Sequence, residues 1–208
     1  VSASSGIDVV LIDQNQESVS KGMESITSIL DQGIKRGKIS NEKKESILGR
    51  ITATEDYSLL KGSNLVVEAV FEDTQVKELA TKKAQKYLDE GTVFATNTST
   101  LPIGKLAEAS ISKAEFIGIH FFSPVHKMAL VEIIKGKETG EKAVATALDF
   151  VKQIRKTPIV VNDARFFYAN RCIIPYINEG VRMIGEGVEP ALIENAARQL
   201  GMPVGPLH

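Results

Sequence analysis

Few residues in the chain are cysteine, histidine or tryptophan: the counts are one, three and none. The single cysteine, Cys172, excludes an internal disulfide, and the apolar residues around it predict a buried thiol. We therefore expect a reducing compartment, a cytoplasm in the first place and a mitochondrial matrix as the alternative.

The chain also lacks an excess of charge and a long apolar run. Its 25 Lys and Arg residues face 26 Asp and Glu residues, so the net charge is -1. This balance leaves no basic surface for nucleic acid or for an anionic membrane. Because no apolar run could span a bilayer, we expect neither a nucleic-acid partner nor a membrane span.

The sequence motifs of three enzyme classes are absent from the chain. There is no Gly-x-Ser-x-Gly turn, no Cys/His cluster at zinc spacing and no Gly-x-x-x-x-Gly-Lys loop. The sequence therefore predicts no metal site, and it does not support a hydrolase or an NTPase.

Short apolar runs alternate with longer amphipathic segments over most of the chain. The runs predict strands at residues 7–12, 51–53, 65–70, 92–95, 116–121, 130–134 and 159–161. Apolar spacings of three and four predict helices over 19–34, 73–88 and 140–154. A shorter helix is predicted to end at about Leu48. This alternation predicts an α/β fold with a parallel, doubly wound, Rossmann-like sheet. The strands at 7–12 and 65–70 are expected to be buried.

The pattern changes near residue 165. Beyond it there is no strand-like run, only predicted helices at 167–184 and 190–200. We interpret residues 1–163 as a Rossmann-like domain and residues 164–208 as the start of an all-helical domain.

An acidic residue, Asp13, follows the strand at 7–12. In a dinucleotide-binding fold such a residue accepts hydrogen bonds from ribose hydroxyls; the alternative is a turn or helix-capping aspartate. The strand and Gly-rich turn that should precede it do not occur between Val1 and Asp13. We therefore expect the first strand and the Gly-rich loop to be missing from this chain.

That missing strand would be central in a sheet of this type, between the strands at 7–12 and 65–70. Without it both strands have an unpaired edge, and buried unpaired backbone groups cost about 1 to 3 kcal/mol each. We expect residues before Val1, or another chain, to supply the strand. The 208 residues alone should bind NAD more weakly than ~1 mM.

An ordered set of motifs occupies the second half of the chain. It comprises Asn97-Thr-Ser-Thr, Gly118-Ile-His-Phe-Phe-Ser-Pro-Val, Met128-Ala-Leu-Val-Glu-Ile-Ile, and Asp163 followed by Asn170-Arg171. This set resembles the L-3-hydroxyacyl-CoA dehydrogenases over essentially the whole chain. Further segments are similar to the dehydrogenase unit of multifunctional fatty-acid oxidation α subunits, which follows an enoyl-CoA hydratase domain: Phe121-Phe-Ser-Pro-Val-His-Lys-Met, Lys156-Thr-Pro-Ile-Val-Val-Asn-Asp, Glu179-Gly180 and Gly201-Met-Pro-Val-Gly-Pro.

The resemblance implies that His120 is the catalytic base and Glu132 its partner. Alcohol oxidation needs a group that takes the hydroxyl proton, and imidazole titrates in the right range. A carboxylate on the far ring nitrogen fixes the tautomer. A lone histidine near a strand end is more often structural, but the surrounding motif favours catalysis for His120. His126 and His208 are interpreted as surface or packing residues.

By the same resemblance, Ser99 and Asn170 donate hydrogen bonds near the substrate 3-oxygen and the nicotinamide carboxamide. Glu72 and Lys77 line the nicotinamide ribose side, and Asn97 belongs with the cofactor-binding residues. The alternative for Glu72 and Lys77 is a solvated charge pair in a first helical turn. For Ser99 it is a turn hydroxyl bonded to its own backbone.

Two further features are open. The family usually has glycine where this chain has Phe166, so the start of the following helix is expected to be rebuilt. A basic stretch could meet the CoA phosphates or be merely solvated: Lys21, Lys35, Arg36 and Lys38.

The resemblance thus implies NAD-dependent oxidation of (S)-3-hydroxyacyl-CoA to 3-oxoacyl-CoA. Asp13 in place of a basic residue favours NAD over NADP. We expect an acyl-CoA substrate and either a homo-oligomer or a fatty-acid oxidation complex with a thiolase subunit. The alternatives are a catalytically silent module kept for assembly or nucleotide sensing, and a dehydrogenase of short hydroxyacids without CoA.

Overall fold

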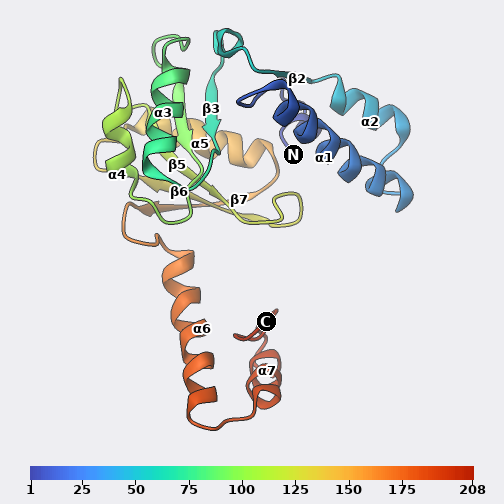
Figure 1. Ribbon diagram of the computed structural model, residues 1–208, viewed down its shortest axis with the longest axis vertical. Helices are drawn as coiled ribbons and strands as arrows, with labels where there is room; N and C mark the ends of the chain where they lie inside the picture. Colours follow the sequence, from blue (N-terminus) through green and yellow to red (C-terminus); the bar gives the residue numbers. More distant parts are fainter. The chain divides into compact units, whose positions relative to one another are not determined.

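The computed structural model describes residues 1–208, which form two compact units, residues 1–163 and residues 164–208 (Figure 1). The first unit alternates strands with helices, and the second contains helices only. The predicted α/β architecture followed by a helical segment is therefore confirmed. Among the helices, none combines enough length with enough apolar character to span a bilayer.

The strands of the first unit form two sheets. The smaller sheet pairs β1 (Val9–Ile12) with β2 (Ile51–Thr54) in parallel. The larger sheet has the order β3-β4-β5-β6-β7, with the bounds Leu65–Glu68, Val93–Thr96, Phe116–Phe121, Leu130–Lys135 and Thr157–Asn162.

The first unit contains five α-helices, three of which begin at a polar side-chain cap. They are α1 (Gln16–Lys35), α2 (Asn41–Leu48), α3 (Thr74–Gln85), α4 (Ile103–Leu106) and α5 (Glu141–Gln153). The side chains of Asn15, Ser40 and Asp73 each accept a hydrogen bond from a backbone N–H of the first turn of α1, α2 and α3. Such caps satisfy donors that the helix itself leaves unpaired.

The sheet departs from the predicted parallel arrangement at one pair of strands. Strands β3, β4 and β5 are parallel, but β5 pairs with β6 in antiparallel orientation, and β7 then runs parallel to β6. Residues 122–129 connect β5 to β6, and a parallel crossover needs about a dozen residues or more. The short connection therefore forces the chain to reverse.

The expectation of buried strands is also wrong for β1 and for most of β3. All four residues of β1 are half-buried, as are the first three residues of β3. Each strand pairs along one edge only, β1 with β2 and β3 with β4, so neighbouring strands cover them less than β4 and β5. That a strand from outside these residues joins the two sheets stays a prediction.

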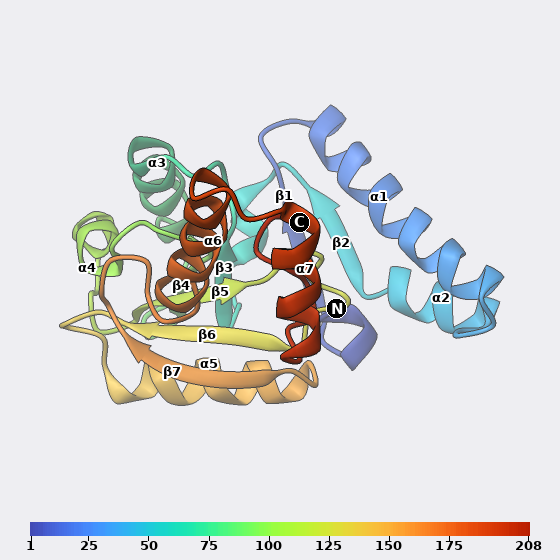
Figure 2. The same cartoon turned by 90° about the horizontal axis from the view of Figure 1, so that it is seen from below.

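The core of the larger sheet lies under α5, on one face of the sheet (Figure 2). Alternate residues of β4, β5 and β6 pack there against three small or branched residues of α5: Ala143, Ala147 and Val151. The opposite face carries Gly118, whose Cα faces the Ile103 side chain of α4. His120 lies two residues further along β5, on this same face.

The second unit contains α6 (Ala169–Gly185) and α7 (Pro190–Gln199) (Figure 1). The C-terminal segment packs on both helices: Pro206 fills the space beside Gly180, and the Leu207 N–H donates to Glu194 at 2.8 Å. The prediction of a buried thiol is wrong, because Cys172 is exposed. Helix α6 buries only Gly180, so its apolar sequence does not imply a buried position for Cys172.

The chain between the units turns at two phenylalanines. Phe166 and Phe167 have φ values of 66° and 53°, in the left-handed region that favours glycine. Helix α6 accordingly begins at Ala169, later than the predicted start at residue 167. The backbone conformation usual for glycine is thus present at Phe166, and a rebuilt helix start relative to the family stays a prediction.

Gly118 offers a test of the close packing between β5 and α4. A Cβ added there would lie 2.7 Å from Ile103 Cδ1 and 3.0 Å from Ile134 Cβ. We expect Gly118→Ala to lower the free energy of unfolding by about 1 to 3 kcal/mol, the usual cost of overpacking. Urea unfolding measures the change. Gly22→Ala in α1 is the control, because its Cβ would meet only Leu11 at 3.6 Å, and it should stabilise by up to about 1 kcal/mol. A Gly118→Ala protein as stable as the parent would contradict the packing.

Candidate active site

The candidate active site is built around two residues that face each other across β5 and β6. His120 and Glu132 are register partners of this antiparallel pair, and His120 Nδ1 lies 2.7 Å from Glu132 Oε2. His120 is 4% exposed and Glu132 is 0% exposed. A buried carboxylate needs a partner of this kind, because desolvation without one is very costly.

The contact with Glu132 decides which ring nitrogen of His120 has which task. A carboxylate accepts a hydrogen bond, so Nδ1 carries the proton that it shares with Glu132. The other nitrogen, Nε2, then has the lone pair that a base requires. The Phe122 ring packs against the imidazole with 4.5 Å between the ring centres, which restricts the orientation of the imidazole.

A second buried polar group lies at the carboxyl ends of β3 and β4. Lys77 of α3 is only 1% exposed, and its Nζ donates to Glu68 Oε1 at 3.0 Å. The same ammonium donates to the carbonyl oxygens of Val70 at 3.3 Å and Asn97 at 3.1 Å. An ammonium has three N–H groups, so these three acceptors use all of them.

The interpretation of Lys77 as part of a solvated charge pair is therefore wrong. The periodicity of α3 placed Lys77 in the first helical turns but could not show which face points to the sheet. The partner that draws it inward is Glu68, the last residue of β3, which sequence reasoning missed. The available signal was an acidic residue inside an otherwise apolar run, Leu65-Val-Val-Glu-Ala-Val.

Glu72 holds the loop that contains Ser99. Its Oε1 accepts hydrogen bonds from the Thr98 hydroxyl at 2.6 Å and from the N–H groups of Ser99 at 2.9 Å and Thr100 at 3.2 Å. Its Oε2 lies 3.6 Å from Lys77 Nζ. Burial alone would raise the pKa of the Glu72 carboxyl, but the hydrogen bonds from Thr98 and Ser99 and the charge of Lys77 outweigh burial and lower that pKa.

Asn97 connects this group to the strand of His120. Its N–H donates to the Glu68 carbonyl at 2.7 Å, which continues the pairing of β3 with β4. Its side-chain Oδ1 accepts from the N–H of Phe121 at 3.1 Å. Phe121 directly follows His120, so Asn97 joins the two polar clusters through one side chain.

Asp13 lies elsewhere, directly after β1, and is exposed. Its Oδ1 accepts from the N–H of Gln14 at 2.7 Å, as in the turn interpretation, while the carboxylate remains open to solvent. An exposed carboxylate at the carboxyl end of a parallel strand fits ribose hydroxyls, which donate hydrogen bonds.

The structure thus brings most of the predicted site residues into two joined clusters. His120 lies against Glu132, while Ser99 shares with Glu72 the group that also contains Lys77 and Asn97. Asp13 is at the end of β1 in the smaller sheet, and Asn170 belongs to α6 in the second unit.

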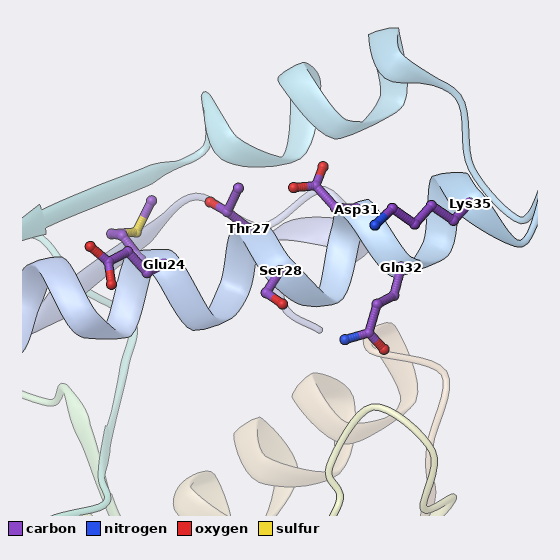
Figure 3. A pocket seen from close by; sticks show the side chains of 7 residues that line it. Glu24, Thr27, Ser28, Asp31, Gln32 and Lys35 are labelled. Carbon is purple, nitrogen blue, oxygen red and sulfur yellow. The ribbon is translucent and has the colours of Figure 1, made fainter.

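The basic stretch contributes Lys35 to the lining of a shallow depression on α1, and acidic residues lie within the same helix. Lys21 is paired with Glu17 at 2.6 Å. Figure 3 shows Lys35 at one end of the depression, which has a volume of about 530 Å³ and is also lined by Glu24 and Asp31. These carboxylates oppose the binding of CoA phosphates.

Two family models match the chain. The model of the "3-hydroxyacyl-CoA dehydrogenase, NAD binding domain" matches residues 1–164, and that of the "3-hydroxyacyl-CoA dehydrogenase, C-terminal domain" matches residues 167–208. Among curated proteins, the fatty acid oxidation complex subunit alpha of Shewanella halifaxensis is 38% identical over 195 residues, or 94% of this chain. That of Shewanella baltica is 37% identical over 201 residues. The chain spans 28% of the length of each.

Solved structures give the same picture. The (S)-3-hydroxybutyryl-CoA dehydrogenase from Ralstonia eutropha is 37% identical with a TM-score of 0.95, over 99% of this chain and 73% of the other. The 3-hydroxybutyryl-CoA dehydrogenase from Escherichia coli is 31% identical with a TM-score of 0.94, over 99% of this chain and 44% of the other.

The lowered pKa of Glu72 predicts a pH-dependent effect of Glu72→Gln. A carboxyl whose pKa is lowered by folding stabilises the protein above its unfolded-state pKa, and this stabilisation is lost as the pH falls through the folded-state value. At pH 7 the variant should melt roughly 2 to 4 °C lower, the scale of one solvent-screened interaction in a chain of this size. Below pH 4 the difference should shrink. Thermal melts across this pH range test it, with exposed Glu24→Gln as control; a difference that grows with acidity would contradict the prediction.

Proposed function

Because the chain belongs to the 3-hydroxyacyl-CoA dehydrogenase family, we propose that the protein oxidises (S)-3-hydroxyacyl-CoA to 3-oxoacyl-CoA, while NAD⁺ is reduced to NADH and a proton is released. The observation that carries the proposal is the buried His120–Glu132 pair, which is the machinery of a general base. A catalytically silent module would have no need of a buried histidine and carboxylate in contact, so the pair argues against that alternative.

The role of the pair follows from its geometry. When NAD is bound, it supplies the acceptor for the hydride from C3 of the substrate. His120 takes the proton of the 3-hydroxyl on Nε2, since Nδ1 is engaged by Glu132. Glu132, which is fully buried, stabilises the imidazolium that forms and keeps the ring oriented.

The polar groups at the strand ends suit the cofactor. We propose that Asp13 accepts hydrogen bonds from the adenosine ribose, and that the exposed side of Glu72 faces the nicotinamide ribose. Lys77, which is 1% exposed, and Asn97 support that side of the site by holding the segments around it. Support comes from the donor and acceptor types: ribose offers hydroxyl donors, and Asp13 and Glu72 offer carboxylate oxygens. The carboxyl ends of parallel strands are where such cofactors bind.

Substrate contacts and domain roles extend the proposal. Ser99 and Asn170 would donate hydrogen bonds near the 3-oxygen and the nicotinamide carboxamide. Residues 1–163 would then act as the NAD-binding domain and residues 164–208 as the start of the helical dehydrogenase domain. The two family-model matches, which meet close to residue 165, support this assignment.

The setting of the reaction is proposed from the curated relatives. These are α subunits of fatty acid oxidation complexes in Shewanella species, and the solved neighbours are named for acyl-CoA substrates. We therefore infer a role in fatty-acid β-oxidation on CoA thioesters rather than free hydroxyacids, in a bacterial cytoplasm. The protein would work as a homo-oligomer or in a complex with a thiolase subunit.

His120→Gln in the intact protein tests the proposed base. Loss of a general base whose partner remains should lower kcat by about 10² to 10⁴-fold and leave NADH affinity almost unchanged. Steady-state assays with acetoacetyl-CoA and NADH measure the first quantity, and NADH fluorescence the second. The exposed His126→Gln is the matched control and should behave as the parent. Near-normal turnover of His120→Gln would refute the role of His120 as the base. Separately, parent activity on free acetoacetate equal to that on acetoacetyl-CoA would refute the proposal of a CoA substrate.

Asp13 is expected to select NAD over NADP. A carboxylate repels the 2′-phosphate of NADP, so Asp13→Ser combined with Gln14→Arg should shift the kcat/KM ratio toward NADP by about tenfold or more. Glu17→Gln in the first turn of α1 is the control for a general loss of negative charge. If the parent already uses NADP as well as NAD, this role of Asp13 is wrong.

A further inference from the structure

Glu68 is a buried carboxylate beside the site to which the proposed function assigns no role. It is 6% exposed at the end of β3, and both of its oxygens are engaged. Oε1 accepts from Lys77 at 3.0 Å and from the N–H of Val70 at 2.7 Å, while Oε2 accepts from the Thr96 hydroxyl at 2.7 Å. To bind a cofactor, this carboxylate would have to give up hydrogen bonds that compensate for its burial.

Lys77 is likewise buried and uses all its hydrogen-bonding groups within the protein. Its three N–H groups are used by Glu68, the Val70 carbonyl and the Asn97 carbonyl, and it is 1% exposed. It therefore acts on a cofactor through what it holds. The two carbonyls belong to different segments: Val70 precedes Glu72, and Asn97 precedes the loop with Ser99.

We propose that Glu68 is a positioning residue of the dehydrogenase site: through Lys77 it fixes the two chain segments that present Glu72 and Ser99 to the cofactor and substrate. This inference rests on the proposed function and assigns a role to a residue outside the predicted set. The contacts define a chain of three steps, from Glu68 to Lys77, from Lys77 to the Val70 and Asn97 carbonyls, and from Glu72 to the Ser99 N–H.

The charge of Glu68 decides where the Glu72 carboxylate lies. Lys77 contacts Glu68 at 3.0 Å but stays 3.6 Å from Glu72, which instead accepts from the 98–100 loop. Without the Glu68 charge, the buried ammonium would have Glu72 as its only carboxylate neighbour. Glu72 would then move toward Lys77 and release the N–H groups of Ser99 and Thr100.

Glu68→Gln in the intact protein tests this, because glutamine keeps the shape and, in its amide oxygen, the acceptor for Lys77, while it removes the charge. Its NH₂ group replaces the oxygen that accepts from Thr96, whose hydroxyl can accept in turn. Two readouts are needed. Hydrogen exchange by mass spectrometry reports the N–H groups of residues 98–101. Steady-state kinetics separate KM for NAD from kcat.

We expect exchange at residues 98–101 to accelerate at least about tenfold and KM for NAD to rise about tenfold to a hundredfold, the range for misplaced groups. kcat at saturation should stay within about threefold, because the His120–Glu132 pair is intact. Phe94→Leu is the control. It opens the core at the start of β4, away from the loop ends, and should lower the melting temperature without either local effect.

Three results would overturn the proposal. They are unchanged exchange at 98–101, unchanged KM for NAD, or the same changes in Phe94→Leu. If Glu68→Gln does not fold, Glu68→Asp replaces it, because the shorter side chain keeps the charge but moves it away from Lys77. Exchange at residues 98–101 and KM for NAD should then change in the same direction by a smaller factor. If the parent shows no dehydrogenase activity, the proposed function fails, and the exchange data still decide whether Glu68 positions the loop.

Discussion

Strands β6 and β7 run against β3, β4 and β5, and this reversal places Glu132 directly beside His120. In an antiparallel pair, opposite residues lie on the same face of the sheet with their Cβ atoms about 4.5 to 5.5 Å apart. A histidine and a carboxylate at such positions meet without help from a loop. The short connection of residues 122–129, which prevents a parallel crossover, is therefore also what builds the base.

Contacts around the end of β5 hold the backbone near His120 in place. Gly118, two residues before His120, lets Ile103 of α4 pack closely on β5. Asn97, at the end of β4, accepts from the N–H that follows His120. The imidazole is thus oriented by Glu132 of β6, and the backbone beside it is held by Asn97, which follows β4; the sheet supplies the preorganisation that a base needs.

Sequence reasoning succeeded where a pattern or a motif specifies a local structure. The alternation of apolar runs and helices was sufficient for the α/β architecture, and the motif around His120 was sufficient to pair it with Glu132. It failed where tertiary contacts decide. Lys77 is buried because Glu68 and two carbonyls meet it, and no periodicity in α3 encodes that. Cys172 is exposed because α6 buries so little of its surface, although its neighbours in sequence are apolar.

The direction of β6 shows the same limit. The apolar run at Leu130–Lys135 predicts a strand, but its orientation depends on the length of the preceding connection and not on the run itself. Phe166 is a different case: its positive φ shows that a phenylalanine adopts the backbone conformation usual for glycine, and a rebuilt helix start relative to the family stays a prediction.

The placement of Lys77 and Glu68 is a final clue to their purpose. A buried ion pair adds little net stability compared with apolar residues of the same volume, because desolvation offsets most of the attraction. Stability alone would therefore favour a leucine and a methionine at these positions. The pair lies instead at the carboxyl ends of β3 and β4, where the backbone leaves the sheet and carbonyl groups have no strand partner. The Lys77 ammonium has enough donors to hold the carbonyls of Val70 and Asn97 together there and to pair with Glu68 as well, so the cost of burying the pair is tied to the shape of the loops that bear Glu72 and Ser99.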